Sequence, residues 1–117
     1  MCLENEPAVL SGIKTLLSDW GCEVLAVRDR LSALACIHSG TFVPHLLLVD
    51  YHLDGNVNGI GVADELQACW GSEVPSIIIT ADHTQDAKRA ASAHGYQVLP
   101  KPIKPAALRA LMNRMLA

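Results

Sequence analysis

The stretch that decides the fold is LLLVD at residues 46–50, four apolar side chains that end at a carboxylate. A second run of the same kind, SIII at 76–79, ends at Thr80. Continuous apolar runs of this length are typical of strands that are covered on both faces, as in a parallel sheet. We therefore expect both runs to lie at the centre of a buried sheet.

Three further short apolar runs read as strands: MCL at 1–3, VLAV at 24–27 and VL at 98–99. Between the runs, apolar residues recur at the spacing of amphipathic helices. Proline suits the first position of a helix and glycine the residue just past its end, so these residues mark the expected boundaries. The first expected helix runs from Pro7 to just before Gly21, the fourth from near Asp82 to near Gly95, and the fifth from Pro105 through Met115. The second carries Leu31, Leu34 and Ala35 and ends near Gly40, and the third carries Val62, Ala63, Leu66 and Trp70 and ends at Gly71.

Strand and helix thus alternate five times in one short chain. This alternation predicts an α/β fold with a single five-stranded, doubly wound parallel sheet and helices on both of its faces. The chain has 117 residues, which is the size of one compact domain, and no linker interrupts it. We therefore expect one domain over residues 1–117.

Composition narrows the class of function. Half of the residues are hydrophobic and the formal net charge is −3, with no basic block, which argues against a nucleic-acid partner. No signal peptide is visible, and no apolar run approaches the roughly 20 residues needed to cross a bilayer. The four cysteines lack the spacing of a metal site, so we expect small, reduced, buried side chains in a cytoplasmic setting.

Ligands of open α/β sheets bind at the carboxyl ends of the strands, so the polar residues at those ends carry the chemistry. Carboxylate and carbonyl oxygens there form a hard-oxygen site of the kind that Mg²⁺ prefers. A carboxylate can attack phosphorus to form an acyl phosphate, while a hydroxyl and an ammonium hold the phosphoryl oxygens. The candidate residues are Glu4, Asn5 and Glu6 after the first strand, Asp50 after the third, Thr80 after the fourth and Lys101 after the fifth.

Four pieces of the sequence, in order and spacing, resemble the receiver domain of bacterial response regulators, and the resemblance covers essentially the whole chain. The resemblance implies a flavodoxin-like strand order of 2-1-3-4-5, as in the chemotaxis receiver. The matching pieces are LENEP at 3–7, LLLVDYHLDG at 46–55, IIITAD at 77–82 and LPKPIKP at 99–105.

Carried over residue by residue, the resemblance makes Asp50 the phosphoacceptor, Thr80 the switch hydroxyl and Lys101 the lysine that pairs with the phosphoryl group. It makes the bond between Lys101 and Pro102 cis, which a proline permits. It also implies a Mg²⁺ site, whose ligands would be Glu4, Asn5, Asp50 and the backbone carbonyl of His52.

The sequence departs from the family pattern at two places. The acidic pair that holds the metal is usually two aspartates, whereas this chain has Glu4 and Asn5, which predicts weaker Mg²⁺ binding. The switch aromatic usually stands three residues before the lysine, where this chain has Val98; Tyr96 lies five before it. The usual coupling between threonine and aromatic residue is therefore not expected in its ordinary form.

The resemblance also implies partners. The phosphodonor is a histidine kinase or a phosphotransfer domain, and the output is a domain or protein that binds the face formed by the fourth helix, fifth strand and fifth helix. The stretches LENEP, VDYHLDG and YQVLPKPIKPAALR resemble receivers at the C-terminus of hybrid sensor histidine kinases. We therefore expect a cytoplasmic domain without membrane contact of its own, in a parent chain that is a hybrid kinase and can itself be membrane-anchored.

Two alternatives remain open from the sequence. The first is a pseudo-receiver, an interaction module that never takes phosphate, which Glu4, Asn5 and Val98 favour. The second is a haloacid-dehalogenase-like phosphatase, which also uses a strand-end aspartate. That family needs a second aspartate two residues later, where this chain has His52. In the leading reading the domain is a phosphoacceptor rather than a turnover enzyme.

Overall fold

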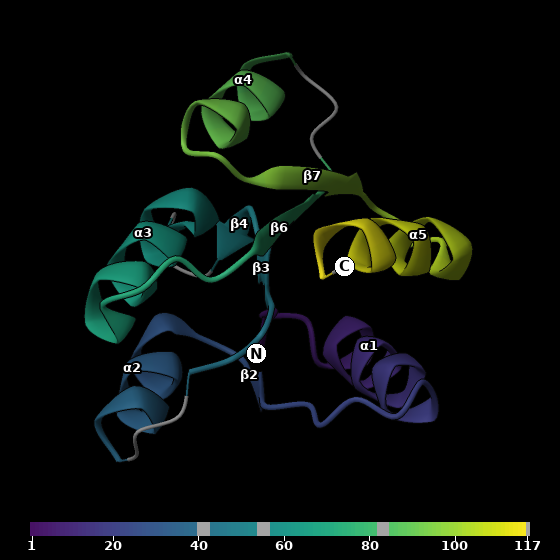
Figure 1. Cartoon of the computed structure of the whole chain (residues 1–117), viewed down its shortest axis with the longest axis horizontal. Coiled ribbons are helices and arrows are strands. Elements are labelled where there is room, and N and C mark those ends of the chain that lie inside the picture. Colours follow the sequence, from purple (N-terminus) through teal and green to yellow (C-terminus); the bar gives the residue numbers. More distant parts are fainter. Residues whose placement is uncertain (40–42, 54–56, 82–84, 117) are drawn as a thin grey trace.

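The computed structural model describes residues 1–39, 43–53, 57–81 and 85–116. The main sheet has five strands, all parallel, which lie in the order β2-β1-β3-β6-β7 (Figure 1). Counted within this sheet alone, that order is 2-1-3-4-5, so the predicted fold is confirmed. The strands are β1 (Cys2–Leu3), β2 (Ala26–Val27), β3 (Leu47–Asp50), β6 (Ser76–Thr80) and β7 (Gln97–Pro100).

Helices cover both faces of the sheet, as Figure 1 shows. One face carries α1 (Pro7–Asp19) and α5 (Pro105–Met115). The other face carries α2 (Arg30–His38), α3 (Gly59–Trp70) and α4 (Gln85–Ala93). None of the described helices combines the length and apolar character needed to cross a bilayer.

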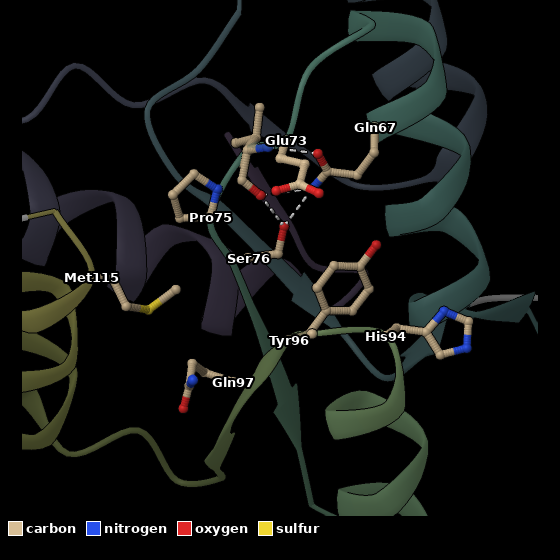
Figure 2. Close-up of a pocket in the computed structure, with 10 residues that line it drawn as sticks. Gln67, Glu73, Pro75, Ser76, His94, Tyr96, Gln97 and Met115 are labelled. Carbon is tan, nitrogen blue, oxygen red and sulfur yellow. Dashed lines mark hydrogen bonds between the residues drawn. The ribbon is translucent and has the colours of Figure 1, made fainter.

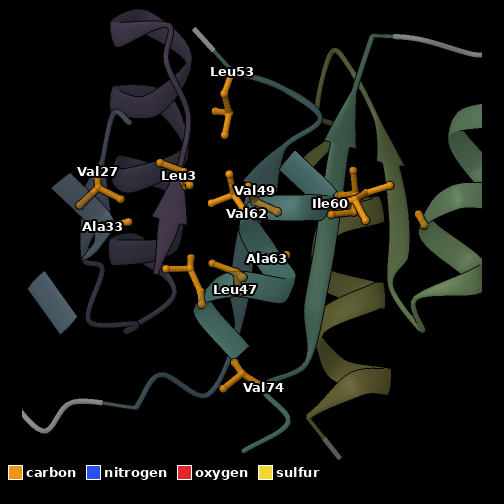
Figure 3. Close-up of a cluster of buried hydrophobic side chains, with 13 residues drawn as sticks. Leu3, Val27, Ala33, Leu47, Val49, Leu53, Ile60, Val62, Ala63 and Val74 are labelled. Atoms are coloured by element: carbon orange, nitrogen blue, oxygen red, sulfur yellow. The ribbon is translucent and has the colours of Figure 1, made fainter. Parts of the chain in front are cut away.

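The core is divided by the sheet into two apolar layers. Successive side chains of a strand point to opposite faces. Leu47 and Val49 therefore pack under α2 and α3 (Figure 3), whereas Leu48 between them packs under α1 and α5. Every side chain of this strand is buried, which explains why Leu47, Leu48 and Val49 form a continuous apolar run rather than an alternating one.

The expected helix boundaries hold where the structure describes them. Pro7 and Pro105 stand at the first positions of α1 and α5. Gly71 ends α3 in the left-handed conformation with φ of 67°, which suits a residue without a Cβ atom. Gly40 and Asp82, which we expected near two further boundaries, lie outside the described residues.

The structure differs from the sequence-based expectation in three ways. β2 is only two residues long, although VLAV at 24–27 reads as a longer strand. A two-stranded antiparallel pair, β4 (His52–Leu53) with β5 (Val57–Asn58), follows the central strand and was not expected. Cys69 is exposed, so the expectation that every cysteine is buried is wrong.

Candidate functional site

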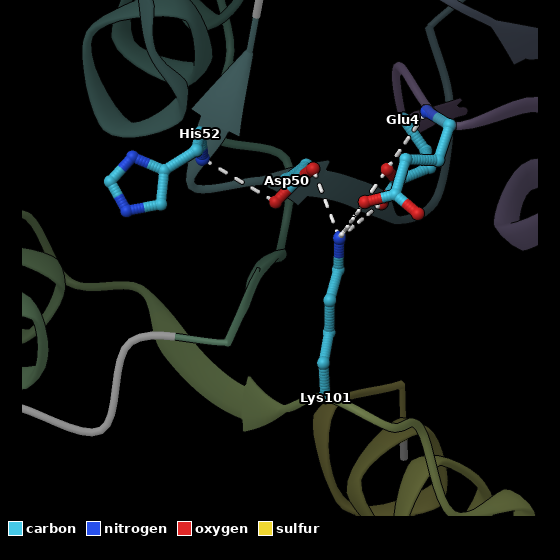
Figure 4. Close-up of polar contacts among 5 residues, drawn as sticks. Glu4, Asp50, His52 and Lys101 are labelled. Atoms are coloured by element: carbon cyan, nitrogen blue, oxygen red, sulfur yellow. Dashed lines mark hydrogen bonds and ion pairs between the residues drawn. The ribbon is translucent and has the colours of Figure 1, made fainter.

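The centre of the site is Asp50, the last residue of β3. Its side chain is buried at the carboxyl edge of the sheet, and the residue is only 4% exposed. Oδ2 lies 3.1 Å from Nζ of Lys101, and Oδ1 accepts a long hydrogen bond of 3.4 Å from the backbone N–H of His52 (Figure 4). Asp50 therefore presents a buried carboxylate that one ammonium and one backbone amide hold in place.

Lys101 connects the ends of three strands. It follows β7, and its backbone N–H donates to the carbonyl of Thr80 at the end of β6, at 2.8 Å. The peptide bond between Lys101 and Pro102 is cis, as the resemblance implied. Nζ reaches across the sheet edge to Oε2 of Glu4 at 3.1 Å, as well as to Asp50 (Figure 4). A single lysine thus lies between two buried carboxylates.

Glu4, which follows β1, is fully buried. Oε1 accepts a 3.1 Å hydrogen bond from the backbone N–H of Glu6, while Oε2 accepts none from any described residue, despite its ion pair with Lys101. Burial, followed by a hydrogen bond to the carboxyl group of Asp50, raises the pKa of Glu4 to about 6, against the opposing effect of Lys101. Negative charge is therefore crowded at this edge.

The protonation of Lys101 follows from the same crowding. Burial alone lowers the pKa of Lys101, but the hydrogen bonds to Asp50 and Glu4 outweigh that effect, so the pKa stands above its ordinary value. The lysine is a fixed positive charge at neutral pH.

Thr80 lies beside these residues at the same edge. It is the last residue of β6, whose neighbours are β3 and β7, and its side chain is buried. The sequence pattern predicted that Asp50, Thr80 and Lys101 stand at adjacent strand ends, and the sheet order places all three strand ends side by side.

The residues proposed as metal ligands fit a hard cation. The donors are the carboxylates of Glu4 and Asp50, the amide oxygen of Asn5 and the backbone carbonyl of His52. The buried Oε2 of Glu4, which lacks a hydrogen bond among the described residues, is the kind of atom that a bound cation satisfies. Glu6 is the exposed N-cap of α1, 4.0 Å from Nζ of Lys101, so it lies at the margin of the site.

The charge of this donor set is low. Among the described residues, no three His, Cys, Asp or Glu side chains gather closely enough to hold a metal ion. Two carboxylates with neutral oxygens suit Mg²⁺, which is usually bound through one or two carboxylates and keeps several waters. The set therefore fits Mg²⁺, with little surplus negative charge.

A family model described as "Response regulator receiver domain" matches residues 1–113, a span that includes every residue of the site. The chain belongs to this family. It is a receiver domain of two-component systems.

Two curated relatives of this receiver carry the name GacS. "Sensor histidine kinase GacS" of Pseudomonas protegens is 32% identical over 107 residues, which cover 88% of this chain and 12% of the relative. "Sensor protein GacS" of Pseudomonas syringae pv. syringae is 30% identical over 109 residues, with the same coverage of 88% and 12%. The receiver therefore corresponds to a small part of the length of each relative.

Solved structures agree on the fold. The receiver domain of NtrX from Brucella abortus superimposes with a TM-score of 0.80 at 26% identity, over 98% of this chain and 95% of that one. A CheY-like receiver domain protein from Methanospirillum hungatei JF-1 gives a TM-score of 0.85 at 20% identity, over 98% and 90% of the two chains.

The structure also shows where Val98, at the usual position of the switch aromatic, and the nearby Tyr96 lie. Val98 lies in β7 and Tyr96 immediately before it, and both pack against the apolar layer under α3 and α4. The Tyr96 hydroxyl donates a hydrogen bond to Asp64 of α3, and its ring stacks on His94, whose Nδ1 lies 2.7 Å from the same carboxylate (Figure 2 shows both rings). Sequence reasoning missed this cluster, because its members come from separate elements.

Two hollows adjoin the site of this receiver. A groove of about 390 Å³ runs from Thr80 along β7 to Tyr96, beside the half-buried Val98. A larger and mostly apolar groove of about 900 Å³ lies between α1 and the segment after β7, and Lys101 contributes to its wall. Apolar side chains that line this second groove include Val9, Ile13, Leu16, Pro102 and Ile103.

Proposed function

We propose that this receiver accepts a phosphoryl group on Asp50 from a phosphohistidine, in the presence of Mg²⁺. The observation that carries the proposal is the buried Asp50 carboxylate, 3.1 Å from the ammonium of Lys101. One oxygen of Asp50 attacks the phosphorus and forms an acyl phosphate. The bond between phosphorus and the donor nitrogen breaks, and its electron pair stays with the leaving imidazole.

The residues around Asp50 have separate tasks in this step. Lys101 exchanges its contact with the free carboxylate for one with a phosphoryl oxygen, and the hydroxyl of Thr80 donates to another. Glu4, Asn5, Asp50 and the His52 carbonyl would hold Mg²⁺. A bound Mg²⁺ offsets the negative charge that accumulates between the carboxylates and the phosphoryl group.

The phosphodonor in this proposal is a histidine kinase or a phosphotransfer domain. The apolar groove between α1 and the segment at Pro102 and Ile103 is a suitable docking place, because Lys101 forms part of its wall and the acceptor lies next to Lys101. The phosphorylated form then changes its affinity for an output domain or protein at the face of α4, β7 and α5. We propose that the signal leaves by a route other than an aromatic residue at position 98.

We further infer that residues 1–117 form one such domain, that its parent is a hybrid sensor histidine kinase, and that it works in the cytoplasm. The similarity to part of GacS supports the parent, since those relatives carry a receiver-like segment in a much longer kinase chain. The domain itself is a phosphoacceptor. The phosphatase alternative is not proposed, because its second aspartate would stand where His52 is.

A pseudo-receiver is the second candidate. The neutral Asn5 and the contact of Lys101 with both carboxylates favour it, because together they reduce the negative charge that would attract a metal ion. The two candidates are separated by incubating the domain with acetyl phosphate and Mg²⁺ and measuring its intact mass. A phosphoryl adduct that is lost in Asp50→Ala supports the phosphoacceptor, whereas the absence of an adduct in the wild-type domain supports the pseudo-receiver.

A further inference from the structure

Gly59, the first residue of α3, packs directly against the backbone of the phosphoacceptor. A Cβ atom at this position would lie 1.9 Å from the carbonyl oxygen of Asp50, 2.8 Å from its carbonyl carbon and 3.1 Å from Cα of Tyr51. Real Cβ atoms essentially never come within 3.0 Å of such neighbours. All three neighbours are backbone atoms, so no flexible side chain can move aside, and a larger residue must push α3 away from Asp50.

The contact is the closing point of a short loop that starts and ends at the acceptor. The N–H of Gly59 donates to the carbonyl of Tyr51 at 2.8 Å. His52 pairs with Asn58 in the small antiparallel ladder. The chain therefore leaves the sheet at Asp50 and continues through His52. It comes back at Gly59, where the start of α3 packs against the backbone of Asp50.

Asn58 fixes the direction in which α3 begins. Its side-chain oxygen accepts a 2.8 Å hydrogen bond from the N–H of Ile60, which caps the helix. The cap supplies local stability, whereas Gly59 supplies the close approach, so the two effects can be separated by mutation.

Close packing, and not an unusual backbone conformation, explains why position 59 is a glycine. Gly21, Gly71 and Gly95 have positive φ angles, whereas Gly59 does not. Gly61 lies two residues further along the same helix, and a Cβ atom there would meet nothing within 4 Å. The chain thus offers a matched pair of helical glycines, of which only the first touches the acceptor.

We propose that Gly59 is a positioning residue for phosphoryl transfer. It sets the position of the Asp50 backbone, and with it the geometry between the Asp50 carboxylate, Lys101 and the His52 carbonyl. This inference rests on the proposed function, since phosphorylation of Asp50 is one of its readouts. Relieving the clash in Gly59→Ala requires a shift of about 1 Å, because 1.9 Å must become at least 3.0 Å. A misplacement of that size costs a reaction about 100-fold in rate.

The test compares Gly59→Ala with Gly61→Ala and Asn58→Ala. Phosphorylation by acetyl phosphate is followed over a range of donor concentrations, Mg²⁺ binding is measured by calorimetry without a donor, and unfolding is followed in urea. We expect Gly59→Ala to lose about 100-fold in maximal rate, with a smaller change in the half-saturating donor concentration, and to bind Mg²⁺ more weakly. Gly61→Ala should match the wild type in its maximal rate and in its affinity for Mg²⁺. Asn58→Ala should be less stable yet phosphorylated at a rate near that of the wild type.

A maximal rate of Gly59→Ala within twofold of the wild type would overturn the proposal. So would an equal loss in Asn58→Ala at equal loss of stability, because the effect would then be structural only. If Gly59→Ala does not fold, the wild-type protein still gives a test by nuclear magnetic resonance. The amide signal of Gly59 should shift on addition of Mg²⁺ more than that of Gly61, and equal or absent shifts would contradict the proposal.

The failure of the proposed function gives a different result. In that case the wild type itself takes no phosphoryl group, while the Mg²⁺ titration and the Gly59 signal still report on positioning.

Discussion

Nζ of Lys101 lies 3.1 Å from Oδ2 of Asp50 and 3.1 Å from Oε2 of Glu4. The single positive charge of the lysine is therefore shared between two buried carboxylates in the unphosphorylated state, although the proposed phosphoryl step needs it for only one of them. We expect these three charged groups to influence stability, metal binding and reactivity. Variants of each residue therefore test a different one of these properties.

The first prediction concerns Glu4. Because the pKa of Glu4 is raised to about 6, the folded state holds its proton more tightly than the unfolded state does. The stability contributed by the protonated group is fully present below the unfolded pKa, near 4.5, and is lost as the pH rises through about 6. Glu4→Gln, which resembles the protonated form, should therefore be more stable than the wild type at pH 7.5, by at most about 2 kcal/mol.

Urea unfolding at several pH values checks this prediction. The difference between Glu4→Gln and the wild type should shrink toward zero as the pH falls to 4.5. Glu65→Gln is the control of opposite sign, because its hydrogen bonds to Arg30 hold the pKa of Glu65 below its ordinary value. That variant should be less stable than the wild type at neutral pH. If Glu4→Gln were less stable than the wild type at pH 7.5, the assignment of Glu4 as a strained carboxylate would be wrong.

Removal of the lysine leaves two carboxylates without a partner cation. Lys101→Met should lower the free energy of unfolding by about 3–5 kcal/mol at neutral pH, the usual effect of breaking a buried ion pair. Mg²⁺ should recover more stability in this variant than in the wild type, because the cation takes over the charge. Denaturation with and without Mg²⁺ measures both effects, and Lys14→Met, on the exposed side of α1, is the control. Equal responses of Lys101→Met and wild type to Mg²⁺ would contradict the proposed metal site.

Asn5 is expected to limit metal affinity. Asn5→Asp adds one negative charge at the proposed site and restores the usual acidic character of the pair, so it should tighten Mg²⁺ binding by about tenfold. Asn113→Asp makes the same change of charge on the exposed surface of α5 and should leave the affinity unchanged. Calorimetric titration of the wild type, Asn5→Asp and Asn113→Asp with Mg²⁺ measures the three affinities. An unchanged affinity in Asn5→Asp would remove Asn5 from the set of ligands.

The hydrogen bond between Tyr96 and Asp64 joins β7 to α3. Burial, and then this hydrogen bond, raise the pKa of Tyr96, so the stability of its neutral form is present below about pH 10 and is lost at higher pH. Tyr96→Phe should lower the free energy of unfolding at neutral pH by about 1 kcal/mol. A double-mutant cycle with Asp64→Ala isolates the pair, and a coupling energy of zero would show that the contact carries no stability.

Much of this structure could be predicted from the sequence, because its central strands are buried on both faces. LLLV at 46–49 and III at 77–79 are continuously apolar, and that pattern leaves few alternatives to a parallel sheet. The gathering of Asp50, Thr80 and Lys101 follows from the same rule, since parallel strands end at one edge. By contrast, VLAV at 24–27 sits at the edge of the sheet, where apolar character does not fix the length of a strand.

The remaining features depend on contacts between distant atoms. The pair β4–β5 has two residues in each strand, too few for a periodic pattern. Glu4 and Glu6 look alike in the sequence, yet the first is fully buried and the second is an exposed N-cap. The contact of Gly59 with Asp50 gives no signal except the glycine itself, because it depends on how α3 returns to the sheet.

The central claim is that Asp50 takes the phosphoryl group. Borohydride reduces an acyl phosphate and converts the acceptor aspartate to homoserine, so peptide mapping after reduction identifies the modified residue. With acetyl phosphate and Mg²⁺, we expect homoserine at position 50 in the wild-type protein and in the control Asp86→Asn, and none in Asp50→Asn. Homoserine at another position, or none in the wild-type protein, would contradict the account.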